Sequence, residues 1–149
     1  MRASAETQGQ ASGNEFVLRV RDRFGGIDRG AWRKLSGAAP GNGGTPYNPF
    51  VSHAFLGALE ESGCATADTG WLPQFLALET PGGEIVAALP CYLKSHSQGE
   101  YVFDHGWADA YERAGGRYYP KLQSSVPFTP VTGPRLLVNP AADQREVMT

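Results

Sequence analysis

The 149-residue sequence is poor in the residues that usually build metal sites and disulfide frameworks. It holds only two cysteines, Cys64 and Cys91, and they lack CxxC spacing. We expect two reduced thiols, with a disulfide as the alternative. The three histidines, His53, His96 and His105, form no HxxxH or HExxH grouping with each other or with cysteine. The sequence therefore predicts no metal site.

Long apolar runs and a strong charge of either sign are also missing. No apolar segment approaches the ~20 residues of a transmembrane helix, so we expect no membrane insertion. Residues 1–15 have no apolar core of a signal peptide and are predicted to be a disordered leader of a cytoplasmic protein. The net charge of −2 and the 19% of charged residues argue against a DNA-binding surface.

Glycine and proline are abundant, with 19 and 11 residues, and they separate a series of short predicted helices and strands. Residues 16–20 read as a strand. Asp28 can cap a helix that carries Ala31, Trp32 and Leu35, and residues 36–47 form a flexible loop. A clearer helix follows Asn48 and ends at Gly63. Its apolar face is formed by Val51, Phe55, Ala58 and Leu59.

The second half of the chain predicts a meander. Segments 71–79 and 84–93 flank the turn sequence TPGG as a hairpin, and Ile85 to Leu89 of the second arm is apolar on both faces, which favours a central strand. Residues 101–104 read as a third strand, and residues 107–116 as a short helix with its stop. After a strand near residues 135–138, Asn139 can cap a helix that starts at Pro140. Because the chain stops inside that helix, we expect it to be truncated.

A segment broken by prolines, YYPKLQSSVPFTPVTGPR (118–135), combines aromatic and polar residues in a pattern that a plain core strand would not have. One hypothesis is that its prolines fix the backbone beside a cleft and that its polar side chains line an acceptor groove. The alternative is an edge strand whose prolines prevent aggregation. The donor-rich turn KSHSQ (94–98) allows a similar choice between a ligand site and a polar hairpin loop.

Motifs of common enzymes are missing: the sequence has no GxSxG elbow, no Walker loop and no GxGxxG between a strand and a helix. Three long stretches instead resemble one family. NPFVSHAFLGALEESG, ALPCYLKSHSQGEYVFD and WADAYERAGGRYYPKLQSSVPFTPVTGPRLLV are similar, in this order, to FemAB-like proteins of peptidoglycan biosynthesis or recognition. That resemblance spans residues 16–138.

The resemblance implies an α/β fold of the GNAT acyltransferase type, with a mostly antiparallel central meander flanked by helices. It covers only the first of two GNAT-like halves, so residues 16–149 are expected to be a partial domain that lacks its C-terminal partner half. The acyl-CoA loop [QR]-x-x-G-x-[GA] is absent: QASGNE and RAGGRY fail at Glu15 and Tyr118. Acyl-CoA or aminoacyl-tRNA would then be used by a full-length protein, with no cofactor held by this fragment.

The function that the resemblance implies is transfer of an acyl or aminoacyl group to an amine acceptor, such as a peptidoglycan precursor. The alternative functions are recognition of a peptide or glycan precursor without catalysis, and an inactive fragment. No residue is assigned as the catalytic base. The predicted substrate-binding residues come from the turn 94–98 and the proline-broken segment: Lys94, His96, Lys121, Gln123, Thr129, Thr132 and Arg135.

Overall fold

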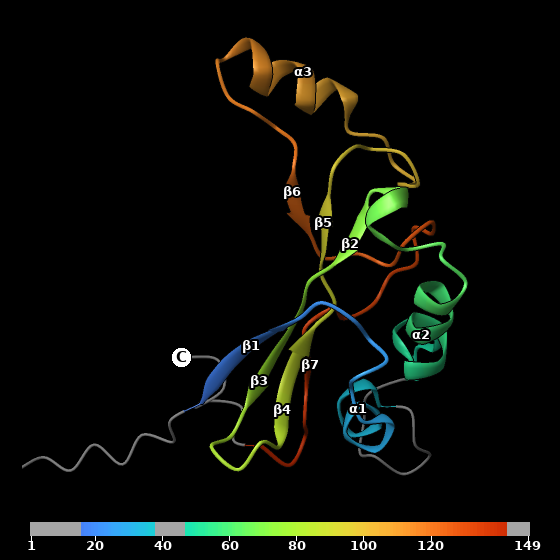
Figure 1. The fold of residues 1–149 in the computed structure, drawn as a ribbon, viewed down its shortest axis with the longest axis vertical. Coiled ribbons are helices and arrows are strands. Elements are labelled where there is room, and N and C mark those ends of the chain that lie inside the picture. The colour runs from blue at the N-terminus through green and yellow to red at the C-terminus, as the bar shows by residue number, and fades with distance from the viewer. Residues whose placement is uncertain (1–15, 38–46, 143–149) are drawn as a thin grey trace, which may run out of the picture.

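The computed structural model describes residues 16–37 and 47–142, which form a mixed α+β fold with two antiparallel sheets. The predicted leader (1–15) and most of the predicted loop (36–47) lie outside these residues. Figure 1 shows a crescent with two lobes. The lower lobe contains the four-stranded sheet A with helices α1 and α2, and the upper lobe contains the three-stranded sheet B with helix α3.

Sheet A has the order β1 (Val17–Arg21), β3 (Phe75–Glu79), β4 (Ile85–Leu89) and β7 (Leu137–Val138). Every neighbouring pair is antiparallel. The strand predicted near residues 16–20 is confirmed, and so is the central place of the apolar second arm of the hairpin. Helices α1 (Arg29–Ser36) and α2 (His53–Glu61) belong to the same lobe.

Sheet B has the order β2 (Trp71–Pro73), β5 (Tyr92–Lys94) and β6 (Lys121–Gln123). The predicted hairpin supplies strands to both sheets, because each of its arms bends. One arm bends at Gln74, the other at Pro90 and Cys91, and the Gln74 N–H donates to the Cys91 carbonyl at 2.8 Å. The single predicted meander is therefore two sheets joined by one bent hairpin.

The strand predicted at residues 101–104 is wrong. This segment is irregular, and Tyr101, Val102 and Phe103 are 67%, 74% and 62% exposed. The chain leaves the sheet after β5 and turns at Gly99, whose φ is +80°. The partner of β5 is instead β6, from the proline-broken segment. Aromatic and β-branched residues favour strands only when a neighbouring strand and a buried face are available to them.

The helix predicted from Asn48 to Gly63 is present in two parts. Asn48 caps the short 3-10 helix η1 (Pro49–Val51), with its side chain accepting from Phe50 N, and Pro49 takes the first position as expected. The chain then becomes extended at Ser52, whose hydroxyl accepts from Phe55 N and starts α2. The second cap was missed because Ser52 stands inside an otherwise continuous helical pattern. Ala58, predicted on the apolar face, is exposed, and Leu56 is the fully buried residue.

Helix α3 (His105–Arg113) confirms the short helix expected after the meander. Its aromatic residues Trp107 and Tyr111 face solvent, at 76% and 54% exposure, and Ala108 is its buried residue. After β7 the Asn139 side chain accepts from Ala141 N, which is the beginning of the predicted cap. Residues 143–149 lie outside the described part. Of the helices described, none is long and apolar enough to span a membrane.

The core is a chain of aromatic rings that runs from one lobe to the other. Trp32 stacks edge-on with Phe24 at 4.8 Å between centroids, and Phe24 with Phe75 at 5.2 Å. The series continues from Phe75 to Tyr92 at 5.5 Å and from Tyr92 to Trp71 at 5.4 Å. Such edge-to-face pairs contribute about 0.5–1.5 kcal/mol each beyond burial. The bent hairpin carries three of these rings and thereby joins both lobes into one core.

Replacement of Asp28, the N-cap of α1, tests how much this cap contributes to the stability of the protein. Asp28 is extended, and its carboxylate accepts from Ala31 N at 2.8 Å. We expect Asp28→Ala to lower the free energy of unfolding by about 1 kcal/mol, because a helix N–H loses its partner. Urea denaturation measures the loss, and Asp22→Ala, at an exposed position before the helix, serves as the control. Equal stability of the two variants would show that the cap contributes nothing.

Candidate ligand pocket

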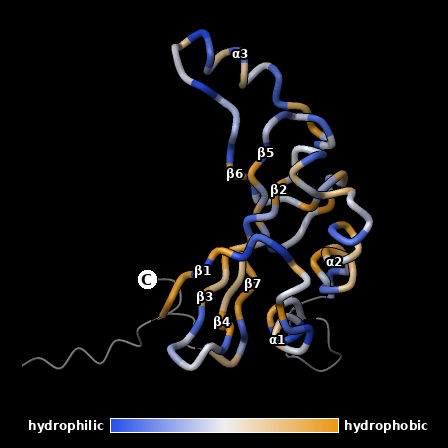
Figure 2. The backbone as a smooth tube through the Cα atoms, viewed as in Figure 1, coloured by the Kyte–Doolittle hydropathy of each residue, from blue (hydrophilic) through white to orange (hydrophobic). Residues whose placement is uncertain are grey.

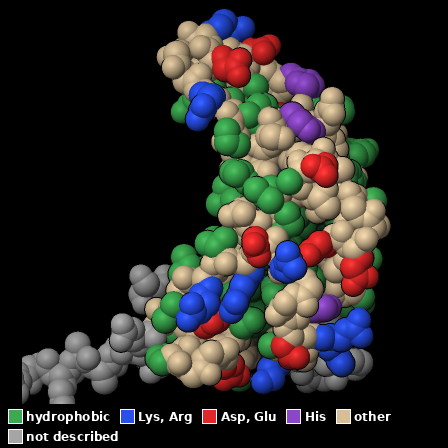
Figure 3. Space-filling model, in the orientation of Figure 1, with side chains coloured by type: hydrophobic (Ala, Val, Ile, Leu, Met, Phe, Trp, Pro, Cys, Tyr) green, Lys and Arg blue, Asp and Glu red, His purple; other side chains and the backbone are tan. Residues whose placement is uncertain are grey.

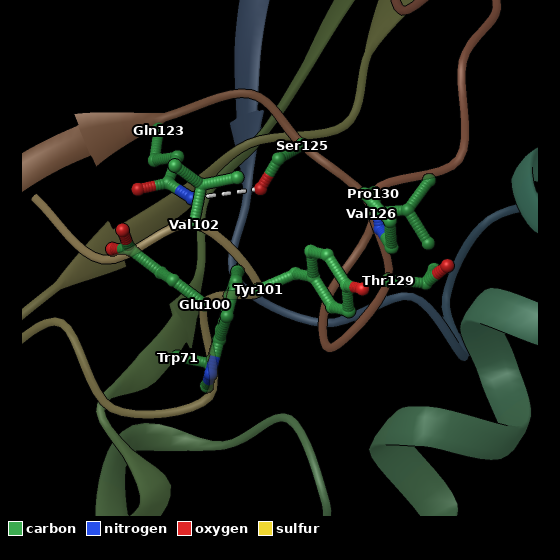
Figure 4. Close-up of a pocket in the computed structure, with 9 residues that line it drawn as sticks. All are labelled: Trp71, Glu100, Tyr101, Val102, Gln123, Ser125, Val126, Thr129 and Pro130. Carbon is green, nitrogen blue, oxygen red and sulfur yellow. Dashed lines mark hydrogen bonds between the residues drawn. The ribbon is translucent and has the colours of Figure 1, made fainter.

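A pocket of about 160 Å³ lies in the upper lobe, where the proline-broken segment meets the turn after β5. Figure 4 shows Trp71 of β2 on one wall, Glu100 and Gln123 on another, and Tyr101 beside Val126, Thr129 and Pro130. In Figure 3 hydrophobic side chains gather on the concave side of the crescent between the lobes. The residues that line the pocket are Trp71, Glu100, Tyr101, Val102, Gln123, Ser125, Val126, Thr129 and Pro130.

The wall at Trp71 depends on close packing with the turn around Gly99. The Trp71 side chain is buried, and its indole Nε1 has no hydrogen-bond partner among the described residues. A Cβ atom at Gly99 would lie 2.7 Å from that nitrogen and 2.7 Å from the ring of Phe128, so only glycine permits this approach. Phe128 itself has a φ of 64°, uncommon for a bulky residue, and donates its N–H to the Gly99 carbonyl at 3.2 Å.

Lys94 is fully buried behind this wall. Its Nζ lies 3.7 Å from the centroid of the Trp71 ring and donates to the Gln98 carbonyl at 2.9 Å. Burial lowers the pKa of Lys94 and Lys121 lowers it further, whereas Glu100 and Asp104 raise it, and the result is a pKa of about 8. A cation over an aromatic face is stabilised by the ring quadrupole. Lys94 therefore supports a pocket residue without lining the pocket itself.

Two carboxylates and a second lysine complete the polar interior. Lys121 forms ion pairs with Asp104 and, at 3.2 Å, with Glu100 Oε1, and the Tyr119 hydroxyl donates to Asp104 at 2.6 Å. Burial alone would raise the pKa of Asp104. Hydrogen bonds from Lys121, Tyr119 and Tyr118 and the charge of Lys121 outweigh it and lower that pKa to about 2. The site thus holds two basic and two acidic groups in close balance.

Glu100 and Gln123 offer oxygen acceptors to a ligand. The Glu100 side chain is only 6% exposed, and its Oε1, although near Lys121, has no partner in hydrogen-bond geometry among the described residues. Gln123 donates from Nε2 to Ser125 Oγ at 2.8 Å, and its Oε1 likewise has no described partner. Figure 4 shows the two acceptors on the same side of the pocket. Since a buried polar atom without a partner costs about 1–3 kcal/mol, these atoms mark a place for bound water or a ligand.

The structure places the predicted site residues in four different surroundings. Gln123 and Thr129 line the pocket, and Lys94 and Lys121 form the charged layer beside it. His96 packs its ring against Gly70 and accepts from Gln98 N through Nδ1 at 3.2 Å.

Thr132 and Arg135 are placed elsewhere in the loop that follows the pocket. The Thr132 carbonyl accepts from Asn48 Nδ2 at 3.3 Å. The Arg135 guanidinium donates to the Val131, Gly133 and Pro134 carbonyls of its own loop. Neither residue lines the pocket described above, so the single groove expected for all the polar residues of this segment is divided.

Sequence reasoning missed Trp71, Glu100 and Tyr101. Trp71 reads as an ordinary strand residue, and Tyr101 begins the segment 101–104 that was predicted as a strand. Glu100 falls between that segment and the turn 94–98. One signal was available: Gly99 and Glu100 interrupt the apolar alternation, and a lone carboxylate between glycine and three apolar residues is unusual for a solvated hairpin loop. Cys64 and Cys91 are free, as expected. The described residues include no cluster of metal-ligating side chains.

The fold and pocket define a mixed α+β protein with a cavity of about 160 Å³ at the edge of its smaller sheet. Residues 23–149 match the model of the FemAB-like family, described as peptidoglycan biosynthesis/recognition. The match covers well over half of the chain, and the protein belongs to this family. Neither the curated proteins nor the solved structures gave a match.

The lowered pKa of Lys94 predicts a distinct dependence of stability on pH. The pKa is about 8 in the folded protein against an ordinary value of 10.5, so between these values the unfolded chain binds more protons. The free energy of unfolding should therefore rise with pH from 8 to 10.5, by on the order of 3 kcal/mol from this residue alone.

Denaturation at several pH values measures this rise. In Lys94→Met the rise should be reduced relative to the native chain, while Lys34→Met, at an exposed lysine, should retain it. Parallel pH profiles for the native chain and Lys94→Met would mean that Lys94 is solvated or charged throughout this range.

Proposed function

We propose that the chain is the acceptor-binding part of a FemAB-like acyl- or aminoacyltransferase. The upper-lobe pocket would receive the amine-bearing part of a peptidoglycan precursor. The observation that carries this proposal is the buried Glu100 carboxylate, whose Oε1 lacks a hydrogen bond at the pocket wall. Membership of a family of peptidoglycan biosynthesis or recognition supports the class of ligand.

The chemistry of the walls fits a peptide that carries an amine. Glu100 can accept from an ammonium group, and Gln123 Oε1 can share it or accept from an amide N–H. Trp71, Tyr101 and Val126 offer apolar contact to the aliphatic stem. Lys121 already neutralises Asp104, so it can release Glu100 to an incoming cation without leaving a carboxylate unpaired.

The transfer step needs the acceptor amine in its uncharged form, together with donors for the oxyanion that forms at the acyl carbon. Within this proposal Glu100 positions the amine and is the group nearest to its proton. Lys94 has a pKa of about 8 but does not line the pocket, because the Trp71 ring lies between them. Its role in this proposal is to hold that ring in place. The acyl donor, either acyl-CoA or aminoacyl-tRNA, is assigned to no residue of this chain.

A binding experiment tests the role of Glu100. The ligand is a synthetic stem peptide of a peptidoglycan precursor with a free side-chain amine, and calorimetry measures its dissociation constant. We expect Glu100→Gln to weaken binding roughly tenfold to hundredfold, because a charged hydrogen bond contributes about 1.5–3 kcal/mol. Glu61→Gln, at an exposed position on α2, is the matched control and should bind as the native chain does.

The same peptide with its amine acetylated separates this proposal from general peptide recognition. Acetylation should weaken binding to the native chain by a similar factor and should have little further effect on Glu100→Gln. If free and acetylated peptides bind equally well, the pocket does not select an amine. The alternative of a recognition module for another part of the precursor would then be favoured.

A further inference from the structure

The lower lobe has a hollow of its own between helices α1 and α2, away from the upper-lobe pocket. It contains a cavity of about 280 Å³, close to the lower end of the range of about 300–1,000 Å³ that is typical of small-molecule sites. A smaller cavity of about 160 Å³ adjoins it. We call the two together the α1–α2 groove. The larger cavity is lined by Arg29, Arg33, Tyr47, Ser52, His53 and Ala54.

The amphipathic pattern of α1 places two arginines on the side of the helix that lines this groove. Trp32 and Leu35 are buried in the core, and Figure 2 shows hydrophilic and hydrophobic colours alternating along the helix. Arg29 and Arg33 are exposed and stand four positions apart, so they lie next to each other on one side of α1. In Figure 3 Lys and Arg side chains gather beside a histidine on this part of the lower lobe.

The positive charge of the two arginines is not neutralised within the groove. Among the described residues neither of them forms an ion pair, although Arg29 also lines the smaller cavity together with Glu60 and Glu61. The Glu60 carboxylate instead accepts from the Phe24 N–H. The sequence from 36 to 59 contains no acidic residue. The larger cavity is therefore lined by two guanidinium groups and by no carboxylate.

His53, at the start of α2, is held so that one ring nitrogen is left for a ligand. Its Nε2 lies 2.9 Å from the Ile27 carbonyl, and since a carbonyl only accepts, Nε2 carries the proton of this hydrogen bond. The ring also packs against Phe24 at 4.7 Å between centroids. Nδ1 has no partner among the described residues, and it can donate to an anion when the ring is protonated. The Ser52 hydroxyl, in contrast, already donates to the Pro49 carbonyl at 2.6 Å.

The number of positive groups decides which class of anion suits the groove. A carboxylate carries one negative charge and would be paired by one guanidinium, which leaves the other without a partner. A phosphate group carries about −1.5 to −2 charges at neutral pH and presents three acceptor oxygens. Each guanidinium can donate two parallel hydrogen bonds to such oxygens. Two arginines beside a histidine therefore match a phosphate group better than a carboxylate.

We propose that the α1–α2 groove binds the phosphate group of a small molecule, and that Arg29, Arg33 and the imidazole of His53 hold it. Tyr47 lines the same cavity at 59% exposure and offers its ring to the rest of the ligand. This site is independent of the ligand proposed for the upper lobe, so failure of either proposal leaves the other intact.

The chain contains three histidines, and they make a direct test possible. The protein is titrated with inorganic phosphate at constant pH and ionic strength, and the imidazole signals are followed by NMR. We expect the His53 signals to shift until they saturate, whereas those of His96 and His105, which lie in the upper lobe, should stay in place. Signals of His53 that do not move, or equal shifts of all three histidines, would overturn the proposal.

Substitution of the arginines tests the guanidinium groups. Arg29→Gln and Arg33→Gln should each raise the dissociation constant of inorganic phosphate roughly tenfold, because each removes a charged hydrogen bond. Lys34→Gln is the matched control: it removes the same charge from an exposed position of α1 that pairs with Glu84, and it should leave the dissociation constant unchanged. Equal weakening in all three variants would mean general electrostatic attraction and would reject the site.

Two further ligands test the class of compound. Glycerol 3-phosphate should shift the His53 signals and bind at least as tightly as inorganic phosphate, while acetate should bind more weakly than either. If inorganic phosphate binds and glycerol 3-phosphate does not, the groove takes the free ion and the assignment to a phosphorylated small molecule is wrong. If acetate binds as tightly as phosphate, the groove does not select a phosphate group and the proposal is rejected.

Discussion

The contact between the buried Lys94 ammonium and the face of Trp71 is the interaction on which the upper lobe depends. Taking an ammonium out of water costs several kcal/mol, and the lowered pKa of Lys94 reflects that cost. The Trp71 ring, the Gln98 carbonyl and the nearby carboxylates offset part of it. Trp71 belongs to β2, and Gln98, Glu100 and Asp104 belong to the segment that follows β5, so the lysine holds β2, β5 and that segment together. The pocket lies along the side of this arrangement.

The bent hairpin extends that constraint to the rest of the molecule. Its two arms run from sheet A into sheet B, and the rings of Phe75, Tyr92 and Trp71 contact one another along it. Phe24 and Trp32 continue the series into the helical layer, and Trp32 Nε1 donates to the Val51 carbonyl at 2.8 Å. A small upper sheet of three-residue strands cannot bury enough apolar surface to be stable alone. Its order comes from sharing one aromatic core with the lower lobe.

The structural features that could be predicted from the sequence are those determined by a few neighbouring residues. The Asp28 and Asn48 caps, the turn at Pro81–Gly82 and the central place of β4 depend on a few adjacent residues, and all were predicted. The bend of the hairpin and the choice of β6 as the partner of β5 depend on residues about thirty positions apart. No short pattern signals such a pairing. Tyr101–Phe103 has a strand-like sequence and yet lies at the surface, because the position beside β5 is taken.

The residues of the candidate site were harder to predict than the fold, because tertiary contacts bring them together. The pattern identified Lys94, Lys121, Gln123 and Thr129, whose types suit a ligand, but gave no way to separate them from Thr132 and Arg135. What separates them is Trp71 and Glu100, which lie opposite the proline-broken segment through tertiary contact alone. Two lysines and two carboxylates inside such a small lobe are poorly explained by stability, since well-packed apolar side chains of similar volume are often at least as stable as a buried ion pair. Their presence beside unpaired donor and acceptor atoms fits a polar interior that is preorganised for a ligand. In that case Gly99, which permits the close approach of Trp71, is as important to the pocket as the charged residues themselves.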